Sequence, residues 1–284
     1  GDVFVADTGA HRVLQYDATG TTLKHTFGTG RGGLDTEFSY PRDLRVVGNE
    51  LHVLDSGNHR ITVWDIASRN YLRKIAPGQG AANGLPDNPY AFQIDASGNY
   101  FIADTYNYRF QILNNTGAYI TKAGTIGVLT TGNEFLLPKG IAASADKIYV
   151  ADTDNSRIKI FDRSTRAWIN TYGSVGIEMG QFKTPEKMIY REFGVNGNQG
   201  KKLYVIDPNQ NRLTIFDVSD LVYNVTANNP FISPNADAVK DNTVILLVPA
   251  ISVPPGTSTY LLTIRLLVEL RTVKNASVLS QADA

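Results

Sequence analysis

The chain contains no cysteine among its 284 residues. This absence excludes disulfide bonds, thiolate nucleophiles and cysteine-ligated metal sites. A cysteine-free chain suits a secreted or surface protein, because nothing in it can mispair under oxidising conditions. We therefore expect an extracellular or cell-surface location and leave a cytoplasmic one open.

The chain also lacks net charge, because its 27 Lys and Arg residues balance its 27 Asp and Glu residues. Without an excess of positive charge there is no long-range attraction toward a polyanion or an anionic membrane. The composition therefore argues against nucleic acid as a partner.

Long uninterrupted apolar runs are missing too. The most apolar stretch, residues 243–273, is broken by Pro249, Pro254 and Pro255 and carries Arg265 and Glu269. A membrane-spanning helix needs about 20 consecutive apolar residues. The sequence therefore predicts no membrane span.

What the chain does have is typical of a folded, turn-rich β protein. It is 42% hydrophobic and 19% charged, with 25 glycines, 14 tyrosines and 12 phenylalanines. This balance is far from that of disordered chains, which are poor in apolar and aromatic residues.

A repeat runs through the first three quarters of the chain. In each copy an Asp is followed five residues later by Arg and ten residues later by Asp or Asn. The five copies are Asp7, Arg12, Asp17; Asp55, Arg60, Asp65; Asp104, Arg109, Asn114; Asp152, Arg157, Asp162; and Asp207, Arg212, Asp217. The leading Asp residues lie 48, 49, 48 and 55 residues apart, a period that suits one four-stranded propeller blade.

Short apolar segments around each Asp and Arg predict the strands of a blade. The second strands are expected at 3–6, 51–54, 100–103, 147–151 and 203–206, and the third strands at 13–16, 61–64, 110–113, 158–161 and 213–216. Fourth strands follow at 23–27, 71–75, 118–123 and 167–172. Small polar residues between the second and third strands predict tight hairpin turns. A glycine- and asparagine-rich insertion, residues 190–202, is expected to lengthen one loop of the fifth blade.

A proline precedes each innermost strand and indicates a sixth blade. Pro41, Pro89, Pro138 and Pro185 are 48, 49 and 47 residues apart, and Pro234 follows after another 49. Residues 1–218 then hold five recognisable blades, and residues 219–284 hold a degenerate sixth blade plus a closing strand or tail. In that sixth blade we expect residues 243–248 as the second strand and 260–268 as the third, with helix left open for the latter.

The first blade lacks an innermost strand of its own. We expect a C-terminal strand, at residues 270–278, to pair in this blade and close the ring, because closure removes exposed strand edges. The fold class is thus all-β, a β-propeller of six four-stranded blades, with a five-bladed ring as the alternative.

The repeat closely resembles the NHL repeat family, most clearly in residues 150–162 (VADTDNSRIKIFD). The resemblance covers residues 1 to about 218 and implies a propeller, most often of six blades. It also implies relatives of two further kinds, which are calcium- or zinc-dependent lyases and hydrolases, and RNA-binding propellers.

The repeated Asp and Arg residues are interpreted as structural, because a catalytic residue is needed once whereas a structural residue is needed in every blade. We expect each Asp to accept hydrogen bonds from turn amides and each Arg to pair with it. The signature set is Asp7, Arg12, Asp55, Arg60, Asp104, Arg109, Asp152, Arg157, Asp207 and Arg212.

The sequence identifies no catalytic, cofactor-binding or metal-ligating set. His11 and His59 occupy one turn position in neighbouring blades but have no metal-ligand spacing. The innermost strands offer a mixed lining of Asp43, Arg45, Asp95, Glu186, Lys187 and Asp237. No cofactor is predicted, and a calcium or other divalent ion in the channel stays open.

The sequence favours a non-catalytic protein-interaction or scaffolding module that binds a protein partner or a neighbouring subunit. The predicted partner face carries the turns between second and third strands and presents His11, His59, Tyr106, Tyr108, Asp154 and Asn209. Tyrosines there offer rigid amphipathic contact area. Two alternatives remain, a metal-dependent lyase or hydrolase with a channel site and an RNA-binding propeller. A small-molecule or glycan ligand also stays open.

Overall fold

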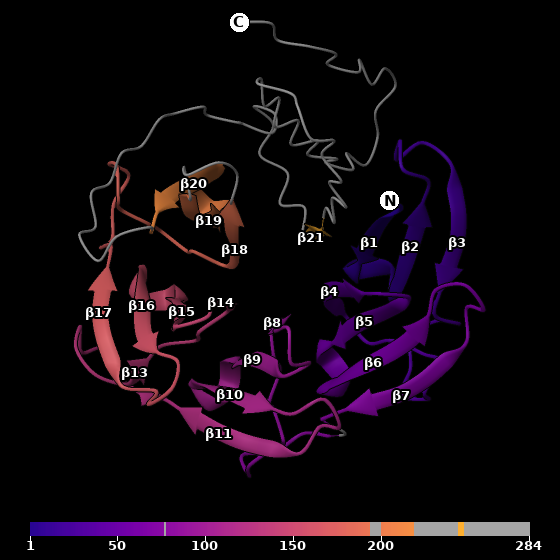
Figure 1. Cartoon of the computed structure of the whole chain (residues 1–284), viewed down its shortest axis with the longest axis horizontal. Coiled ribbons are helices and arrows are strands. Elements are labelled where there is room, and N and C mark those ends of the chain that lie inside the picture. The colour runs from indigo at the N-terminus through magenta and orange to yellow at the C-terminus, as the bar shows by residue number, and fades with distance from the viewer. Residues whose placement is uncertain (77, 194–199, 219–243, 247–284) are drawn as a thin grey trace, which may run out of the picture.

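The computed structural model describes residues 1–76, 78–193, 200–218 and 244–246. These residues form five antiparallel sheets arranged around a common axis, which is the arrangement of a β-propeller (Figure 1). Sheets that stack in this way bury their apolar faces against their neighbours. The all-β propeller prediction is confirmed.

The first two blades are complete. Blade 1 has the strand order β21-β1-β2-β3, built from Val244–Leu246, Val3–Asp7, Arg12–Tyr16 and Leu23–Phe27. Blade 2 has the order β4-β5-β6-β7, built from Pro41–Val47, Glu50–Asp55, Arg60–Asp65 and Tyr71–Ile75.

The remaining three blades follow along the chain. Blade 3 consists of β8 (Ala91–Ile94), β9 (Tyr100–Asp104), β10 (Arg109–Leu113) and β11 (Tyr119–Ala123). Blade 4 consists of β14 (Gly140–Ala143), β15 (Lys147–Asp152), β16 (Arg157–Asp162) and β17 (Trp168–Tyr172). Blade 5 shows three strands among the described residues, β18 (Lys187–Phe193), β19 (Gly200–Asp207) and β20 (Arg212–Asp217).

Ring closure uses a C-terminal strand, as predicted, but a different one. Strand β21 pairs antiparallel with β1, with Val5 opposite Ile245. The sequence predicts residues 243–248 as the second strand of a sixth blade, which is wrong for β21, because this strand is the innermost one of blade 1. It holds the place that the sequence assigns to residues 270–278, and those residues lie outside the described ranges. The fold observed is the five-bladed alternative; the six-bladed prediction is not confirmed, and its proposed strand 260–268 lies outside the described residues.

Each turn between second and third strands is a single 3₁₀ turn that ends on a residue with a left-handed backbone. The five turns are η1 (Thr8–Ala10), η2 (Ser56–Asn58), η3 (Thr105–Asn107), η4 (Thr153–Asn155) and η5 (Pro208–Gln210). His11 and His59 hold the left-handed position in blades 1 and 2, with φ of 56° and 54°. The predicted hairpins are present, with these turns as their connections.

The insertion in blade 5 lengthens two strands. The pairing of β18 with β19 continues from Lys187 opposite Ile206 to Phe193 opposite Gly200. Residues 190–193 and 200–202 of the predicted loop extension are therefore strand.

The core lies between adjacent blades. One cluster joins blades 3 and 4 through Phe101, Phe110, Phe135 and Phe161, all of them at most 1% exposed. In two inter-blade loops a buried Phe packs against a glycine, Phe38 against Gly28 and Phe182 against Gly173. A Cβ on Gly28, whose φ is +95°, would lie 2.5 Å from the Phe38 ring, and so only glycine permits that packing.

Candidate functional site

The chemistry-bearing residues of the repeat gather on the face that carries the five 3₁₀ turns. Here the described inter-blade loops, which precede the innermost strands of blades 2 to 5, fold back on themselves. In one such loop β12 (Thr125–Ile126) pairs parallel with β13 (Glu134–Phe135), and isolated bridges join Arg31 to Phe38 and Val175 to Phe182 in two others. The site is therefore built from turns and loops held by a rigid ring.

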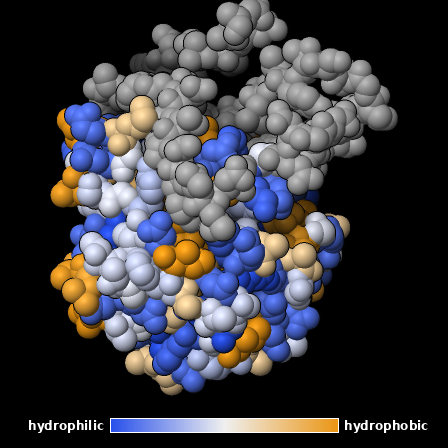
Figure 2. Space-filling model, turned by 60° about the vertical axis from the view of Figure 1, so that its left-hand side comes forward, coloured by the Kyte–Doolittle hydropathy of each residue, from blue (hydrophilic) through white to orange (hydrophobic). Residues whose placement is uncertain are grey.

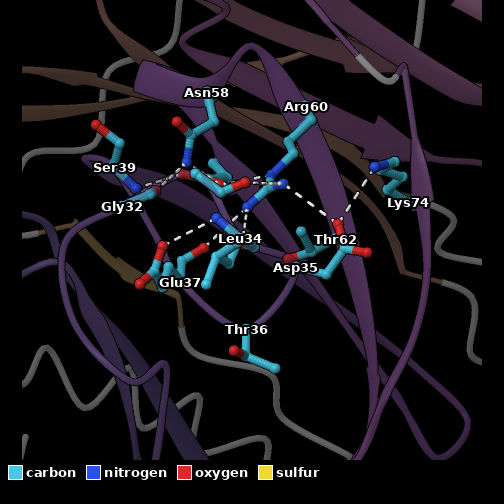
Figure 3. A network of polar contacts seen from close by, with 12 residues as sticks. Gly32, Leu34, Asp35, Thr36, Glu37, Ser39, Asn58, Arg60, Thr62 and Lys74 are labelled. Atoms are coloured by element: carbon cyan, nitrogen blue, oxygen red, sulfur yellow. Dashed lines mark hydrogen bonds and ion pairs between the residues drawn. The ribbon is translucent and has the colours of Figure 1, made fainter.

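The Asp–Arg pairs clamp these loops to the blades. In blade 2, Arg60 Nε donates to Asp55 Oδ2 at 2.8 Å, while its terminal nitrogens donate to the carbonyls of Gly33, Leu34 and Glu37 (Figure 3). Asp55 Oδ1 accepts the amide of Ser39 at 2.6 Å. One buried ion pair thus forms hydrogen bonds with both parts of the loop, because Arg60 donates to its carbonyls and Asp55 accepts an amide near its end.

The same clamp recurs in blades 3 and 4. Arg109 and Arg157 donate to Asp104 and Asp152 at 2.6 and 2.7 Å. Arg109 holds the carbonyls of Ala81 and Ala82, and Arg157 holds those of Val128 and Leu129. Asn58, Asn107 and Asn155 add a bond to the carbonyls of Gly32, Gly80 and Gly127. The structural interpretation of these pairs agrees with this geometry.

The clamp is altered in the first and fifth blades. Arg12 pairs with Asp7 at 2.9 Å, but its side chain is 46% exposed, and Ala10 stands where three other blades have Asn. In blade 5, Arg212 holds the carbonyl of Ile177 at 3.0 Å, and Asp207 accepts the amide of Lys183 at 2.7 Å.

A hydroxyl links each of the first four blades to the next. Thr8, Ser56, Thr105 and Thr153 donate to the carbonyls of Pro41, Pro89, Pro138 and Pro185 at 2.6 to 2.8 Å. In blade 5 the corresponding residue is Pro208, which has no hydroxyl to donate. The prolines recognised in the sequence therefore mark contact points between blades.

The two turn histidines make similar connections. His11 Nδ1 accepts the amide of Tyr40 at 3.1 Å, and its ring lies edge-on to the Tyr40 ring at 4.6 Å. His59 Nδ1 accepts the amide of Asn88 at 2.8 Å. Burial lowers the pKa of both imidazoles. Both rings are partly buried and join neighbouring blades, so only part of each is available to a partner.

The other predicted face residues differ in exposure. Tyr106 is 53% exposed, Asp154 and Asn209 are exposed, and Tyr108 is partly buried. Tyr106 lies in η3 and Tyr108 directly follows this turn, whereas Asp154 and Asn209 lie in η4 and η5. The structure therefore places the six residues on equivalent turns of one face, spread over five blades. A shallow depression beside η5 is lined by Ile177, Lys183 and residues 209–212.

At the axis on this face, a cluster of cations surrounds Tyr90. The Arg42 guanidinium and the Lys139 and Lys187 amines lie 4.7, 5.0 and 5.1 Å from the Tyr90 ring centroid. The Tyr90 hydroxyl donates to Glu186 at 2.7 Å, and Lys139 pairs with the same carboxylate at 2.6 Å. Burial lowers the pKa of Lys187 to about 8.

The rest of the predicted channel lining is used in contacts between blades. Lys187 Nζ donates to the carbonyls of Tyr90 and Arg42, which belong to other blades. Asp43 accepts the amide of Phe92 at 2.9 Å and pairs with Arg45 at 2.8 Å. Asp95 pairs with Arg163. Asp237 lies outside the described residues.

The described residues of this lining do not fit a divalent cation. Glu186, Asp43 and Asp95 each have a cationic partner, and three cations crowd the axis around Tyr90. Calcium and zinc need several anionic or neutral donors free to converge on the ion. In the described part of the chain no three His, Asp or Glu side chains are grouped in a way that could hold a metal.

One set of exposed residues was missed from the sequence. Six aliphatic side chains on two neighbouring loops are 58 to 74% exposed: Ile126, Val128, Leu129, Val175, Ile177 and Met179. The four loops can be aligned on the glycines whose carbonyls are held by the 3₁₀ turns, Gly32, Gly80, Gly127 and Gly176. This alignment shows the difference in the sequence, because Gly33 and Ala81 stand where the two exposed loops carry Val128 and Ile177.

Comparison with known proteins agrees with the repeat. The NHL repeat family model matches residues 38–64 and 135–161, which correspond to parts of blades 2 and 4. The chain therefore carries NHL repeats. No curated protein sequence matches it. No helix in the described ranges has the length and hydropathy needed to cross a bilayer.

Solved structures match the chain at low sequence identity. A protein of unknown function from Bacteroides caccae is 11% identical and superposes with a TM-score of 0.52, covering 77% of this chain and 69% of that one. Hydrazine synthase from Kuenenia stuttgartiensis is 12% identical with a TM-score of 0.41, covering 62% of this chain. This chain spans 55% of the length of that hydrazine synthase chain.

Proposed function

We propose that this β-propeller, which carries NHL repeats, is a non-catalytic protein-interaction or scaffolding module that belongs to a secreted or surface protein or assembly. One observation carries the proposal. On the face with the 3₁₀ turns, the buried charged side chains of blades 2 to 4 serve the fold, whereas the tyrosine of η3 and the aliphatic side chains of two loops are exposed.

The physical basis is preorganisation. Loop backbones fixed by buried ion pairs lose little conformational entropy when a partner binds, and exposed aromatic and aliphatic side chains supply the contact area. The Asp and Arg residues of the repeat are poor candidates for chemistry, because each one is engaged with a loop or with its partner.

The two alternatives have less support. A metal-dependent lyase or hydrolase would need convergent ligands in the channel, where Glu186, Asp43 and Asp95 are paired with cations instead. RNA binding would need a basic surface, and the guanidiniums of Arg60, Arg109 and Arg157 are buried in the clamps. The balanced charge of the whole chain adds to this argument.

The test uses residues that other blades already carry. Tyr106→Asp with Tyr108→Ser installs the residues that blade 4 has at these two positions, Asp154 and Ser156, so the turn is expected to keep its fold. We expect this variant to capture less partner protein from the source organism than the wild type. A control variant with Leu72→Ala and Ile120→Ala, which changes exposed residues of outer strands, should capture as much as the wild type. Equal capture by all three proteins would remove the turn face from consideration.

A further inference from the structure

Four side chains at the axis come from the same position in four blades. Each belongs to the residue that directly follows the proline before an innermost strand, and these residues are Arg42, Tyr90, Lys139 and Glu186. The innermost strands β4, β8, β14 and β18 face the centre of the ring (Figure 1). The repeat thus brings one side chain from each of blades 2 to 5 to the axis, on the face of the 3₁₀ turns. These four residues form the axial set.

The backbone of the axial set is fixed before any ligand arrives. The carbonyl of each preceding proline accepts a hydroxyl from the neighbouring blade at 2.6 to 2.8 Å. Lys187 Nζ also donates to the carbonyls of Arg42 and Tyr90 at 3.1 and 2.8 Å. A site that is ordered in advance loses little conformational entropy on binding.

Charges do not balance around the axial set, although they balance in the whole chain. Lys139 pairs with Glu186 at 2.6 Å, and Asp43 pairs with Arg45 at 2.8 Å and lies 3.7 Å from Lys187. Lys187 has a pKa of about 8 and is therefore mostly protonated at pH 7. Two positive charges stay uncompensated among the described residues, because two carboxylates, Asp43 and Glu186, face four cations: Arg42, Arg45, Lys139 and Lys187.

Arg42 is the least satisfied of these cations. No ion pair joins it to a carboxylate in the described part of the chain, and its guanidinium lies 4.7 Å from the centroid of the Tyr90 ring. Its Nε atom is buried without a hydrogen-bond partner. Buried donors in folded proteins nearly always have an acceptor. Arg42 therefore lacks an acceptor that the described residues do not supply.

Lys139 also keeps donors for a ligand. One oxygen of Glu186 accepts from Lys139, and the other accepts from the Tyr90 hydroxyl at 2.7 Å. A lysine amine has three N–H bonds, so the bond to Glu186 leaves two of them. The side chains of Lys139 and Glu186 are 21% and 18% exposed, and Arg42 is partly exposed as well. A small molecule can therefore reach the axial set from solvent.

The axial cations select a class of ligand, which the outer surface does not. In the view of Figure 2, hydrophobic residues form small separate groups among hydrophilic ones, and such a mixture suits many ligands. An excess of positive charge at one point is neutralised only by an anion. Guanidinium and ammonium groups bind the oxygen atoms of phosphates and carboxylates, whereas a nucleic acid needs a more extended basic surface.

We infer that the axial set binds a small dianion whose charged groups are a phosphate or two carboxylates. The Arg42 guanidinium and the Lys139 amine donate to its oxygen atoms. Lys187 adds positive charge, and the Tyr90 ring offers an apolar contact for the rest of an organic ligand. This inference goes beyond the proposed interaction function and does not depend on it, because the capture experiment changes residues outside the axial set.

Isothermal titration calorimetry of the full chain at pH 7 tests the site, with inorganic phosphate and succinate titrated separately. We expect the wild type to bind at least one of these dianions with a Kd of about 1 mM or tighter. Binding of phosphate alone assigns a phosphorylated ligand, and binding of succinate alone assigns a dicarboxylate. Absence of binding for both would overturn the inference.

Two substitutions should change the affinity in opposite directions. Arg42→Gln removes the unpaired guanidinium and should weaken binding at least about tenfold, because charge-assisted hydrogen bonds are lost. Glu186→Gln removes the carboxylate that occupies Lys139 and should tighten binding at least about threefold, because a like charge beside the ligand disappears. A folding defect does not tighten binding, so Glu186→Gln remains decisive even if Arg42→Gln folds poorly.

Arg31→Gln controls for the change in net charge. Arg31 is an exposed residue of the loop before blade 2, and its replacement alters the net charge by the same amount as Arg42→Gln. We expect this variant to bind the dianion like the wild type. Equal weakening by the two arginine variants, or unchanged affinity in Glu186→Gln, would show that the axial set does not hold the anion.

Discussion

At the residue scale, the buried imidazole of His52 is the clearest titrating group. The equivalent position carries Phe4, Phe101, Tyr149 and Tyr204 in the other blades. His52 lies beside Tyr100, whose hydroxyl is 3.1 Å from Nδ1, and only 4% of its side chain is exposed. Burial lowers the pKa of His52 to about 4, from the 6.5 that is ordinary for an imidazole.

This pKa predicts a loss of stability in acid. Below pH 6.5 the unfolded chain binds a proton at His52 that the folded chain does not bind until about pH 4, so the free energy of unfolding falls through that window. A shift of this size corresponds to a loss on the order of 3 kcal/mol. Urea unfolding at several pH values should show this slope in the wild type, and His52→Phe should reduce it. An unchanged slope in the variant would assign the acid sensitivity to other groups.

At this scale the sequence predicts an ion pair between the Asp and Arg of each turn, and the structure contains this pair in blades 1 to 4. In blade 5 the Nε atom of Arg212 has no hydrogen-bond partner among the described residues. The spacing of five residues predicted the ion pair, because it joins the two ends of one turn. It did not predict that four of the five guanidiniums also hold a loop more than 20 residues away, such as Gly33 for Arg60. Contacts that distant in sequence are set by how the loop folds back.

At the scale of single elements, the burial of the Asp–Arg pair predicts how much stability is lost in each blade when the Arg is replaced. Arg60→Ala leaves Asp55 buried without its ion pair and removes three loop hydrogen bonds. Breaking a buried pair from one side typically costs about 3–5 kcal/mol. Arg12→Ala breaks an exposed pair, which is worth at most about 1 kcal/mol.

Chemical denaturation of the two variants measures this contrast directly. Arg109→Ala and Arg157→Ala should behave like Arg60→Ala, because their pairs are equally buried. Equal losses for Arg12→Ala and Arg60→Ala would show that the loop contacts contribute little to stability.

The strands themselves were predictable to within about two residues for most elements, and β3 and β7 coincide with the predicted ranges. Their apolar residues alternate, and small polar residues bound them, so local sequence carries the information. The insertion in blade 5 was less predictable. Its residues join β18 and β19 because a hairpin can lengthen while keeping its register.

At the scale of the whole molecule, closure of the ring depends on three residues of β21 that are far from β1 in sequence. The pairing of Val5 with Ile245 satisfies the inner edge of blade 1. A proline in a strand lacks the amide hydrogen and disrupts the ladder. Ile245→Pro should therefore lower the thermal midpoint and favour aggregation through the exposed edge of β1.

Leu270→Pro is the matched control, because residues 270–278 were the closing strand expected from the sequence. Because β21 already pairs with β1 at the innermost place of blade 1, we expect Leu270→Pro to lower the thermal midpoint less than Ile245→Pro does. A larger loss for Leu270→Pro than for Ile245→Pro would restore the original expectation. Differential scanning calorimetry of both variants makes the comparison.

The sequence by itself determined the repeat, the class of fold, most strand boundaries and the pairing of Asp with Arg in four of the five blades. These follow from local periodicity and from a motif that recurs in every blade. Only the tertiary structure decided which segment closes the ring, how the channel charges pair around Tyr90, and which loop side chains are exposed. The physical reason is that strand pairing and burial depend on residues from distant parts of the chain, such as Val5 and Ile245 or Lys187 and Tyr90. The local sequence pattern does not indicate which of these distant residues come into contact.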